Sequence, residues 1–405
     1  MILQGQWTGP QRSRTSSSSA DPNATSAQVT PPSRAVTIAL EGGGSLGAFA
    51  WGVLDRLLDT PELRIEAASG ASAGAMNAAM LVQGLATGGP TKAKYLLEVL
   101  WRRIAMASGS PDMDLACLVP DLLNSVMAPA IDAARRAALF NYQPSPLMPN
   151  PLRSVLSGLL DTSVFGRVGT PALVVSATSV RTGDARMFVD AEVTMEALLA
   201  SACLPQVFPA VRIAGEAYWD GGYASNPPLR PLIEAGTPSD IIVIRNTPLE
   251  RPDVPLQPGR ISDRVNEIAF GGALRAELRS LAVAQQILPE VPSLPDGGVL
   301  ARLRDARVHM ISDDTMFRSM HGGSALDPSW KFLVQMREAG HVAAERWLAA
   351  NLVAVGSHSS FDLAALAPDR IHLHTIAGSS LRPPADRDGR DLRPLPDFGS
   401  ERAKT

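Results

Sequence analysis

Two strand–turn–helix units follow each other near the start of the chain, and they constrain its fold more than any other feature. Residues 35–40 form a β-rich apolar run that ends in glycines, and apolar residues then recur at helical spacing over 46–58. A second strand is predicted at 65–68, followed by a tight turn of small residues and a helix over 73–84. Two such units in succession predict parallel neighbouring strands, which is how α/β folds begin.

Later apolar runs fit the same sheet, and the pattern after Pro248 becomes more helical. We therefore expect an α/β fold with a mainly parallel central sheet sandwiched by helices, and with a helical C-terminal extension. The further predicted strands are 172–177, 187–189, 241–244 and 307–311, and the further predicted helices are 261–288 and 328–352.

Composition along the chain divides it into a central part and two tails. Residues 1–34 are rich in Ser, Pro and small polar residues, and residues 379–405 are rich in Arg, Asp and Pro, so both tails are predicted to be disordered. The central domain is predicted over 35–248, and a mostly helical region follows over 249–378. Proline-rich apolar residues at 108–163 form an insert, which either packs as helices and an ordered loop or caps a binding groove.

Charge and hydropathy exclude several classes of function. The net charge of −3 gives no basic excess of the kind that nucleic-acid binding requires. The sequence has no run of about twenty apolar residues, so we expect any membrane contact to be peripheral. Cys117 and Cys203 lack metal-ligand spacing, and the N-terminus lacks the apolar stretch of a secretory signal. These features favour a cytoplasmic protein.

The strongest chemical signal is the G-x-S-x-G sequence Gly70–Gly74, which lies between a predicted strand and a predicted helix. Its glycines allow a sharp turn, so that Ser72 stands exposed at the start of the helix, where amide groups and the helix dipole favour developing negative charge. The alternative is a tight turn without chemistry. The position at a strand-to-helix junction favours Ser72 as a nucleophile.

The glycine-rich segment Gly42–Gly47 follows the first predicted strand and matches G-x-G-x-x-G. A dinucleotide site would need an acidic residue at the end of the second strand, whereas Glu66 lies within that strand and the turn after it is the G-x-S-x-G sequence. The other interpretation is an oxyanion hole, because glycine amides are unobstructed by side chains. Next to a serine nucleophile, the oxyanion hole is the better interpretation.

A third signal, Asp220-Gly221-Gly222, offers a base for the serine. On its own it is more typical of an ordinary turn. Histidine is the usual base, but no histidine of this chain lies in a recognisable triad context, and no third metal ligand accompanies the alternating pair His372 and His374. A serine–aspartate pair would need no histidine. The other four histidines are His309, His321, His341 and His358.

The ordered set LEGGGSLGAF, GASAG, ASACLPQVFP and DGGYASNPP resembles the patatin-like phospholipase family over residues 36–245. The resemblance implies Ser72 as nucleophile, Asp220 as general base, and no metal or organic cofactor. One departure concerns Leu46, where many members carry Arg or Lys, so phospholipids and neutral esters both stay open as substrates. The resemblance further implies oxyanion donors at Gly42, Gly43, Gly44 and Ala73, and motif glycines at Gly47, Gly70, Gly74, Gly221 and Gly222.

The resulting hypothesis is a lipid acyl hydrolase that cleaves carboxylic esters through an acyl-enzyme intermediate, with a lipid or acyl ester as its partner and no nucleic acid. Two alternatives come from other classes. One is a catalytically silent lipid-binding or scaffold protein with the same fold, and the other is a dinucleotide-binding oxidoreductase that uses Gly42–Gly47.

Overall fold

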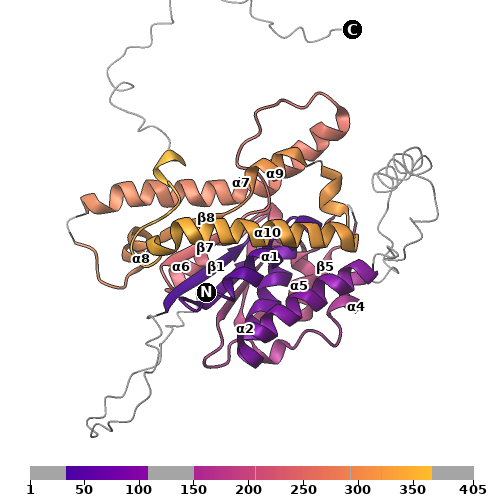
Figure 1. The fold of residues 1–405 in the computed structure, drawn as a ribbon, viewed down its shortest axis with the longest axis horizontal. Helices are drawn as coiled ribbons and strands as arrows, with labels where there is room; N and C mark the ends of the chain where they lie inside the picture. The colour runs from indigo at the N-terminus through magenta and orange to yellow at the C-terminus, as the bar shows by residue number, and fades with distance from the viewer. Residues whose placement is uncertain (1–32, 108–149, 206, 292, 321, 367–405) are drawn as a thin grey trace, which may run out of the picture. The chain divides into compact units, whose positions relative to one another are not determined.

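The computed structural model describes residues 33–107, 150–205, 207–291, 293–320 and 322–366 (Figure 1). The predicted tail 379–405 lies outside these residues, and so does the tail 1–34 apart from residues 33 and 34. Most of the predicted insert at 108–163 also lies outside them. The described residues belong to one compact unit, which ends at Ala367. The domain bounds given above remain predictions.

A mixed eight-stranded sheet forms the centre of this unit, in the order β5-β6-β3-β2-β1-β7-β8, with β4 paired to β3. The neighbours β3-β2-β1-β7-β8 run parallel, while β4, β5 and β6 pair antiparallel. The expected α/β class is confirmed, and the antiparallel pairs stand at one side of the sheet. The strands are β1 (Arg34–Leu40), β2 (Leu63–Gly70), β3 (Ala172–Ser179), β4 (Ala185–Val189), β5 (Val211–Ile213), β6 (Glu216–Asp220), β7 (Asp240–Ile244) and β8 (Arg307–Ile311).

Helices cover both faces of the sheet (Figure 1). On β1, Val36, Ile38 and Leu40 point into the larger core with α1, α2, α5 and α10, whereas Ala39 points into a second core with α6, α7 and α8. This alternation is the period of two that a strand buried on both faces requires. The helices are α1 (Ala48–Leu57), α2 (Ala73–Ala107), α4 (Pro151–Leu156), α5 (Met195–Ser201), α6 (Arg230–Ala235), α7 (Pro258–Ile287), α8 (Val299–Asp305), α9 (Asp314–Ser319) and α10 (Trp330–Asn351).

The helix predicted over 73–84 is longer in the structure. Helix α2 continues to Ala107, but Gly88 and Gly89 have non-helical backbone angles, so that two helical segments meet there at a kink before Pro90. The C-terminal helix α10 packs on α1 at two glycines, because Gly52 contacts the backbone of Arg337. Gly340 in turn contacts the backbone of Phe49. Among the described residues, no helix combines the length and the hydropathy needed to cross a membrane.

Strand β1 lies where the strand order reverses, because the chain continues from it to β2 on one side and returns to β7 on the other. The last residue of β1, Leu40, pairs with both Gly70 and Ile244. The segments that follow these three strands therefore leave the sheet side by side. In α/β sheets this switch point, at the carboxyl ends of the strands, is where ligands bind.

Strands β2 and β6 share one edge of β3. Strand β4 occupies the other edge over residues 174–178, so that β2, paired over 172–175, and β6, paired over 177–179, must lie on the opposite edge. Gly70 ends β2 opposite Val175, and Asp220 ends β6 opposite Ala177. The two strands thus approach each other end to end.

Candidate active site

Ser72 occupies the turn between β2 and α2 with a φ of 55°, a value that residues other than glycine rarely adopt. Such strain is typical of a nucleophile elbow, in which the turn lifts the serine hydroxyl out of the backbone. The helix α2 begins at the next residue, Ala73, so its N-terminal dipole lies beside the hydroxyl. The predicted turn at the strand-to-helix junction is therefore present. The expectation that Ser72 stands exposed is wrong, because Gly42 packs against it and the serine is buried.

The backbone of this elbow is held from the neighbouring helix α5. The amide of Ser72 donates a hydrogen bond to the Ser201 Oγ over 3.0 Å, and both residues are buried. Ser201 belongs to the Ala200–Pro209 segment of the family resemblance, in which no role was predicted for it. The pairing satisfies an amide that the helix itself leaves without a partner.

Asp220 lies fully buried at the end of β6, and its carboxyl group faces the serine. The Asp220 Oδ1 accepts a hydrogen bond of 2.8 Å from the Gly222 amide. The Ser72 hydroxyl approaches the carboxyl group as a donor, short of a full hydrogen bond, and Oδ2 has no hydrogen-bond partner among the described residues. The structure therefore brings together the two side chains that the sequence proposed as nucleophile and base.

Burial raises the pKa of Asp220 to about 7, because removal from water disfavours the carboxylate. The hydrogen bond from the Gly222 amide and the approach of the Ser72 hydroxyl lower the pKa and offset part of this effect. A carboxyl group with a pKa near neutrality can accept a proton from a hydroxyl more readily than an ordinary aspartate can.

The glycine loop, Gly42–Gly44, passes directly against the elbow. A Cβ atom on Gly42 would lie 2.8 Å from the Ser72 Cβ and 2.6 Å from the Ala71 carbonyl oxygen, closer than side chains can approach. Only glycine allows the two segments to be this close. The loop and the serine, predicted from separate motifs, therefore form one site.

The amides of the glycine loop do not have equivalent surroundings. Gly42 is buried and its amide already donates to the Asn226 Oδ1 over 2.6 Å, so it cannot also serve an oxyanion. Gly43 is half-buried and Gly44 exposed, and the amides of both, like that of Ala73, have no partner among the residues described. Three amides of the predicted set therefore have no partner among the described residues, and one of them, that of Ala73, directly follows Ser72.

The remaining motif glycines are positions of close approach. A Cβ on Gly47 would lie 2.7 Å from the Ala73 Cβ, and Gly70 and Gly74 contact each other across the elbow. After Asp220, Gly221 contacts Ser176 and Gly222 contacts the Phe270 ring of α7. At each of these five positions a side chain would collide with a neighbouring atom.

A hydrogen-bond network below the glycine loop was not predicted. Glu41 is fully buried, and its Oε2 accepts hydrogen bonds from the amides of Asn246 and Thr247 over 2.7 and 3.0 Å. Its Oε1 accepts from the Thr247 hydroxyl over 2.7 Å. Burial raises the pKa of Glu41 to about 7, against the lowering effect of Arg245 and of these donors. The sequence feature that could have indicated this network is the position of an acidic residue, Glu41, directly before the glycine run.

A second constellation of polar residues lies away from Ser72, at the edge strand β8. The His309 Nε2 lies 3.0 Å from the Asp240 Oδ1, and the Nδ1 lies 3.0 Å from the Ser360 Oγ. Although burial would raise the pKa of Asp240, hydrogen bonds from His309 and Arg307 lower it below its ordinary value. Arg307 contacts both carboxylate oxygens.

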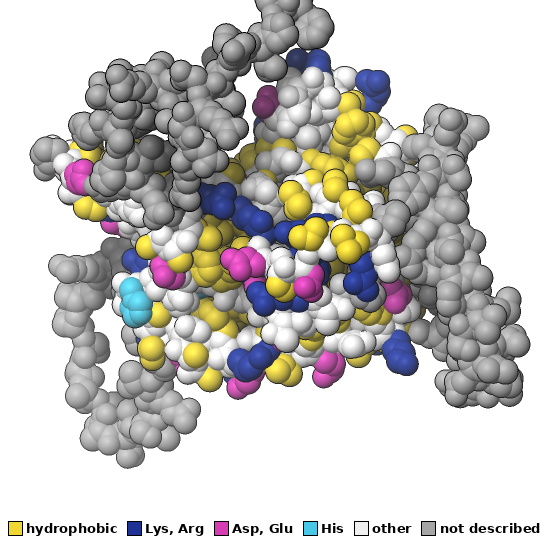
Figure 2. Space-filling view, turned by 90° about the horizontal axis from the view of Figure 1, so that it is seen from above, with side chains coloured by type: hydrophobic (Ala, Val, Ile, Leu, Met, Phe, Trp, Pro, Cys, Tyr) yellow, Lys and Arg dark blue, Asp and Glu magenta, His cyan; other side chains and the backbone are white. Residues whose placement is uncertain are grey.

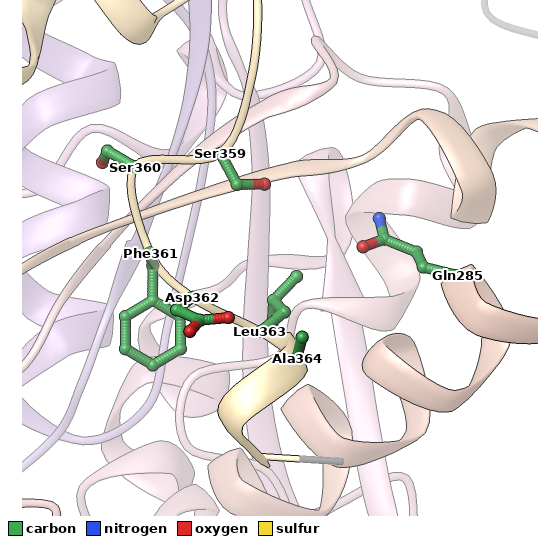
Figure 3. Close-up of a pocket in the computed structure, with 7 residues that line it drawn as sticks. All are labelled: Gln285, Ser359, Ser360, Phe361, Asp362, Leu363 and Ala364. Atoms are coloured by element: carbon green, nitrogen blue, oxygen red, sulfur yellow. The ribbon is translucent and has the colours of Figure 1, made fainter.

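This constellation fixes the segment 359–364 to the sheet. The Val308 amide donates to the Ser359 Oγ, and the Phe361 amide donates to the Val308 carbonyl oxygen. The segment lines a shallow hollow of about 430 Å³ together with Gln285. In Figure 3, Ser360 and Gln285 lie on opposite sides of this hollow, and the Ser360 hydroxyl points away from Gln285. We therefore interpret Asp240, His309 and Ser360 as structural.

The other sequence expectations have mixed outcomes. The buried Cys203 is a free thiol, while Cys117, His321, His372 and His374 fall outside the described residues. The cap predicted within 108–163 also falls mostly outside them. Within the residues that the structure describes, no group of three or more His, Cys, Asp or Glu side chains is arranged to hold a metal ion.

Comparison with known proteins places these residues in a family. Residues 38–233 match the family model described as patatin-like phospholipase. No curated protein matched the chain. Among solved structures, the crystal structure of VipD from Legionella pneumophila is similar at 16% sequence identity, covers 79% of this chain and 67% of its own, and has a TM-score of 0.35. Ser72, Asp220 and the glycine loop all lie within the range of the family match.

Proposed function

Because residues 38–233 are a domain of the patatin-like phospholipase family, we propose that this protein is a lipid acyl hydrolase with a Ser72–Asp220 dyad. One observation carries the proposal: a strained serine at a helix N-terminus faces a buried carboxyl group, and no histidine among the described residues is hydrogen-bonded to either. The amides of Gly43, Gly44 and Ala73, which have no partner among the described residues, support the same function.

In the proposed mechanism, the Ser72 Oγ attacks the ester carbonyl carbon while its proton moves to the Asp220 carboxylate. The tetrahedral intermediate collapses to an acyl-enzyme, and the alkoxide leaves with the proton from Asp220. Water then attacks the acyl-enzyme and its proton passes to Asp220. As the second intermediate collapses, Asp220 returns this proton to the departing Ser72 Oγ, which releases the carboxylic acid and regenerates both residues. The pKa of Asp220, about 7, suits both directions of proton transfer near neutral pH.

We assign the oxyanion hole to the amides of Gly43, Gly44 and Ala73. Gly42 is left out because its amide is already bound to Asn226. In this proposal Gly42 allows the loop to lie against Ser72, and the close contact between the two backbone segments supports this role. Removal of one oxyanion donor typically costs about 3 kcal/mol of transition-state stabilisation, so the arrangement of this loop is decisive for the rate.

The substrate class we propose is a lipid ester that is approached at a lipid surface. Helix α7, whose Phe270 covers Gly222 beside Asp220, exposes a stripe of apolar side chains one helical turn apart. The face drawn in Figure 2 looks down on this end of the molecule and shows hydrophobic side chains gathered beside lysine and arginine. The exposed apolar residues of this stripe are Ile261, Val265 and Ile268, preceded by Val254 and Leu256.

Ester hydrolysis by the purified chain tests the proposal. Wild-type protein and the Ser72→Ala variant are compared on short-chain nitrophenyl esters, on phospholipid vesicles and on emulsified neutral glycerides. We expect hydrolysis by the wild type and a loss of at least about 1,000-fold in the variant, with its thermal unfolding unchanged. Undiminished activity in the variant contradicts the assignment. Binding of vesicles without hydrolysis favours the scaffold alternative, and a shift on NAD(P) titration favours the oxidoreductase.

A further inference from the structure

The glycine loop has no regular secondary structure of its own at Gly42 and Gly43, so its amides must be aimed by neighbouring side chains. On one side, Asn226 accepts the Gly42 amide. On the other side, the segment that follows β7 meets the loop through Asn246. The Asn246 Oδ1 would lie 2.6 Å from a Cβ on Gly43, so this side chain packs directly on the loop backbone.

Asn246 is itself held by the residue that precedes the loop. Its amide donates to the Glu41 Oε2, and its Nδ2 donates to the Glu41 carbonyl oxygen over 3.1 Å. The second carboxylate oxygen of Glu41 binds the hydroxyl of Thr247. One fully buried side chain therefore joins the end of β1 to the end of β7, at the point from which the loop leaves the sheet.

We propose that Glu41 is a positioning residue for the reaction, which fixes the amides of Gly43 and Gly44 through its hydrogen bonds to Asn246 and Thr247. The inference rests on the proposed function, because an oxyanion hole has a purpose only in acyl transfer. Glu41 itself does not contact the substrate. Its carboxylate acts as an acceptor of three hydrogen bonds, and its role is therefore the geometry of the loop rather than proton transfer.

This role predicts a particular difference between two substitutions. Glu41→Gln keeps the length of the side chain and one carbonyl oxygen, which can still accept the two backbone amides, while its amide group can donate to the Thr247 hydroxyl. Glu41→Ala removes every acceptor and leaves the amides of Asn246 and Thr247 without partners. A proton-transfer role would make both variants equally defective, whereas a positioning role spares the glutamine variant.

The experiment measures kcat and KM on a soluble short-chain ester, the rate of labelling by a fluorophosphonate, and thermal unfolding. Asp240→Ala is the matched control, because Asp240 is a buried carboxylate at the opposite end of β7 with donors of its own. We expect Glu41→Ala to lower kcat and the labelling rate by about 10- to 100-fold, with KM within about twofold of the wild type. Glu41→Gln should retain kcat within about threefold, and Asp240→Ala should lose stability but retain kcat.

The outcomes separate the inference from the proposed function. A wild-type protein that neither hydrolyses esters nor reacts with the fluorophosphonate contradicts the function itself. An active wild type with an equally active Glu41→Ala variant overturns only the positioning role, and so does a glutamine variant as defective as the alanine variant. If Glu41→Ala does not fold, Asn246→Ala takes its place, because it removes the side chain that packs on Gly43. Wild-type kcat in that variant likewise overturns the inference.

Discussion

Ser72 and Asp220 face each other because β2, which ends just before the turn that holds Ser72, and β6, which ends at Asp220, meet the same edge of β3. Gly70 pairs with Val175, and Asp220 pairs with Ala177, so that β2 and β6 approach end to end from opposite directions. Neither side chain is delivered by a loop alone. The proposed dyad is therefore set by sheet register, which gives it the rigidity that a two-residue catalytic arrangement requires.

The pKa of Asp220 predicts how activity depends on pH. In the proposed mechanism the base must be ionised, and burial raises its pKa to about 7. We therefore expect kcat/KM to rise about tenfold per pH unit below neutrality and to level off above it. The measurement is hydrolysis of a soluble uncharged ester between pH 5 and 9. A profile that is flat across this range contradicts Asp220 as the base.

The same buried carboxyl group predicts a stability effect of opposite direction. A pKa raised to about 7 in the folded state means that the folded protein holds this proton more tightly than the unfolded chain does. The stabilisation is complete below the unfolded pKa, about 4, and is lost as pH rises through 7, with a slope of about 1.4 kcal/mol per pH unit. Asp220→Asn removes this dependence.

Urea unfolding at a series of pH values measures the effect. The free energy of unfolding of the wild type should fall relative to that of Asp220→Asn between pH 4.5 and 7.5. Glu41, whose pKa burial also raises to about 7, contributes equally to both proteins and cancels from the difference. Parallel curves for the two proteins would show that the Asp220 pKa is not raised.

Substitution of Gly42 tests the contact between the glycine loop and the elbow. In Gly42→Ala the new methyl group would meet the Ser72 Cβ at 2.8 Å, so loop and serine must move apart. We expect kcat to fall by about 100-fold, since a displacement of about 1 Å at a reacting centre has effects of this size. Gly272→Ala on α7 is the control, because a Cβ there meets no atom within 4 Å. Equal kcat values in the two variants would refute the contact.

The apolar stripe of α7 predicts how the protein meets lipid. Val265 is 59% exposed, and its replacement by Asp should weaken binding to anionic phospholipid vesicles by about tenfold, because an apolar side chain no longer leaves water. Hydrolysis of soluble esters should be unchanged. Val342→Asp on α10, where the valine is 54% exposed, is the control. Vesicle sedimentation decides: the same loss in both variants would mean that α7 is not the contact surface.

Local patterns were sufficient for the two glycine-rich turns, for Ser72 and for every strand except β5 and β6, because each depends on residues that are neighbours in sequence. The strand that carries Asp220 was not predicted, since β6 is short and its partner Ala177 is distant along the chain. The register between strands that are distant in sequence is set by packing across the sheet. The alternation of apolar and polar residues along one strand does not determine it.

The division of roles within the glycine loop was likewise beyond the pattern. Gly42, Gly43 and Gly44 are identical in sequence, and only the side chain of Asn226, placed by a different segment, removes one amide from the available donors. Glu41 stood next to the motif, but its acceptor role depends on Asn246 and Thr247, which the sheet brings to it from the end of β7. Contacts between segments that follow different strands depend on the order of the strands in the sheet, and not on the spacing of residues along the sequence.

The most direct test of the central claim is to find which residue becomes covalently modified. Wild-type protein is treated with a fluorophosphonate, digested and examined by tandem mass spectrometry, with Asp220→Asn in parallel. The account predicts a single adduct on Ser72 in the wild type and a greatly slowed reaction in the variant. An adduct on another serine such as Ser360, or ester hydrolysis that continues while Ser72 stays unmodified, would contradict it.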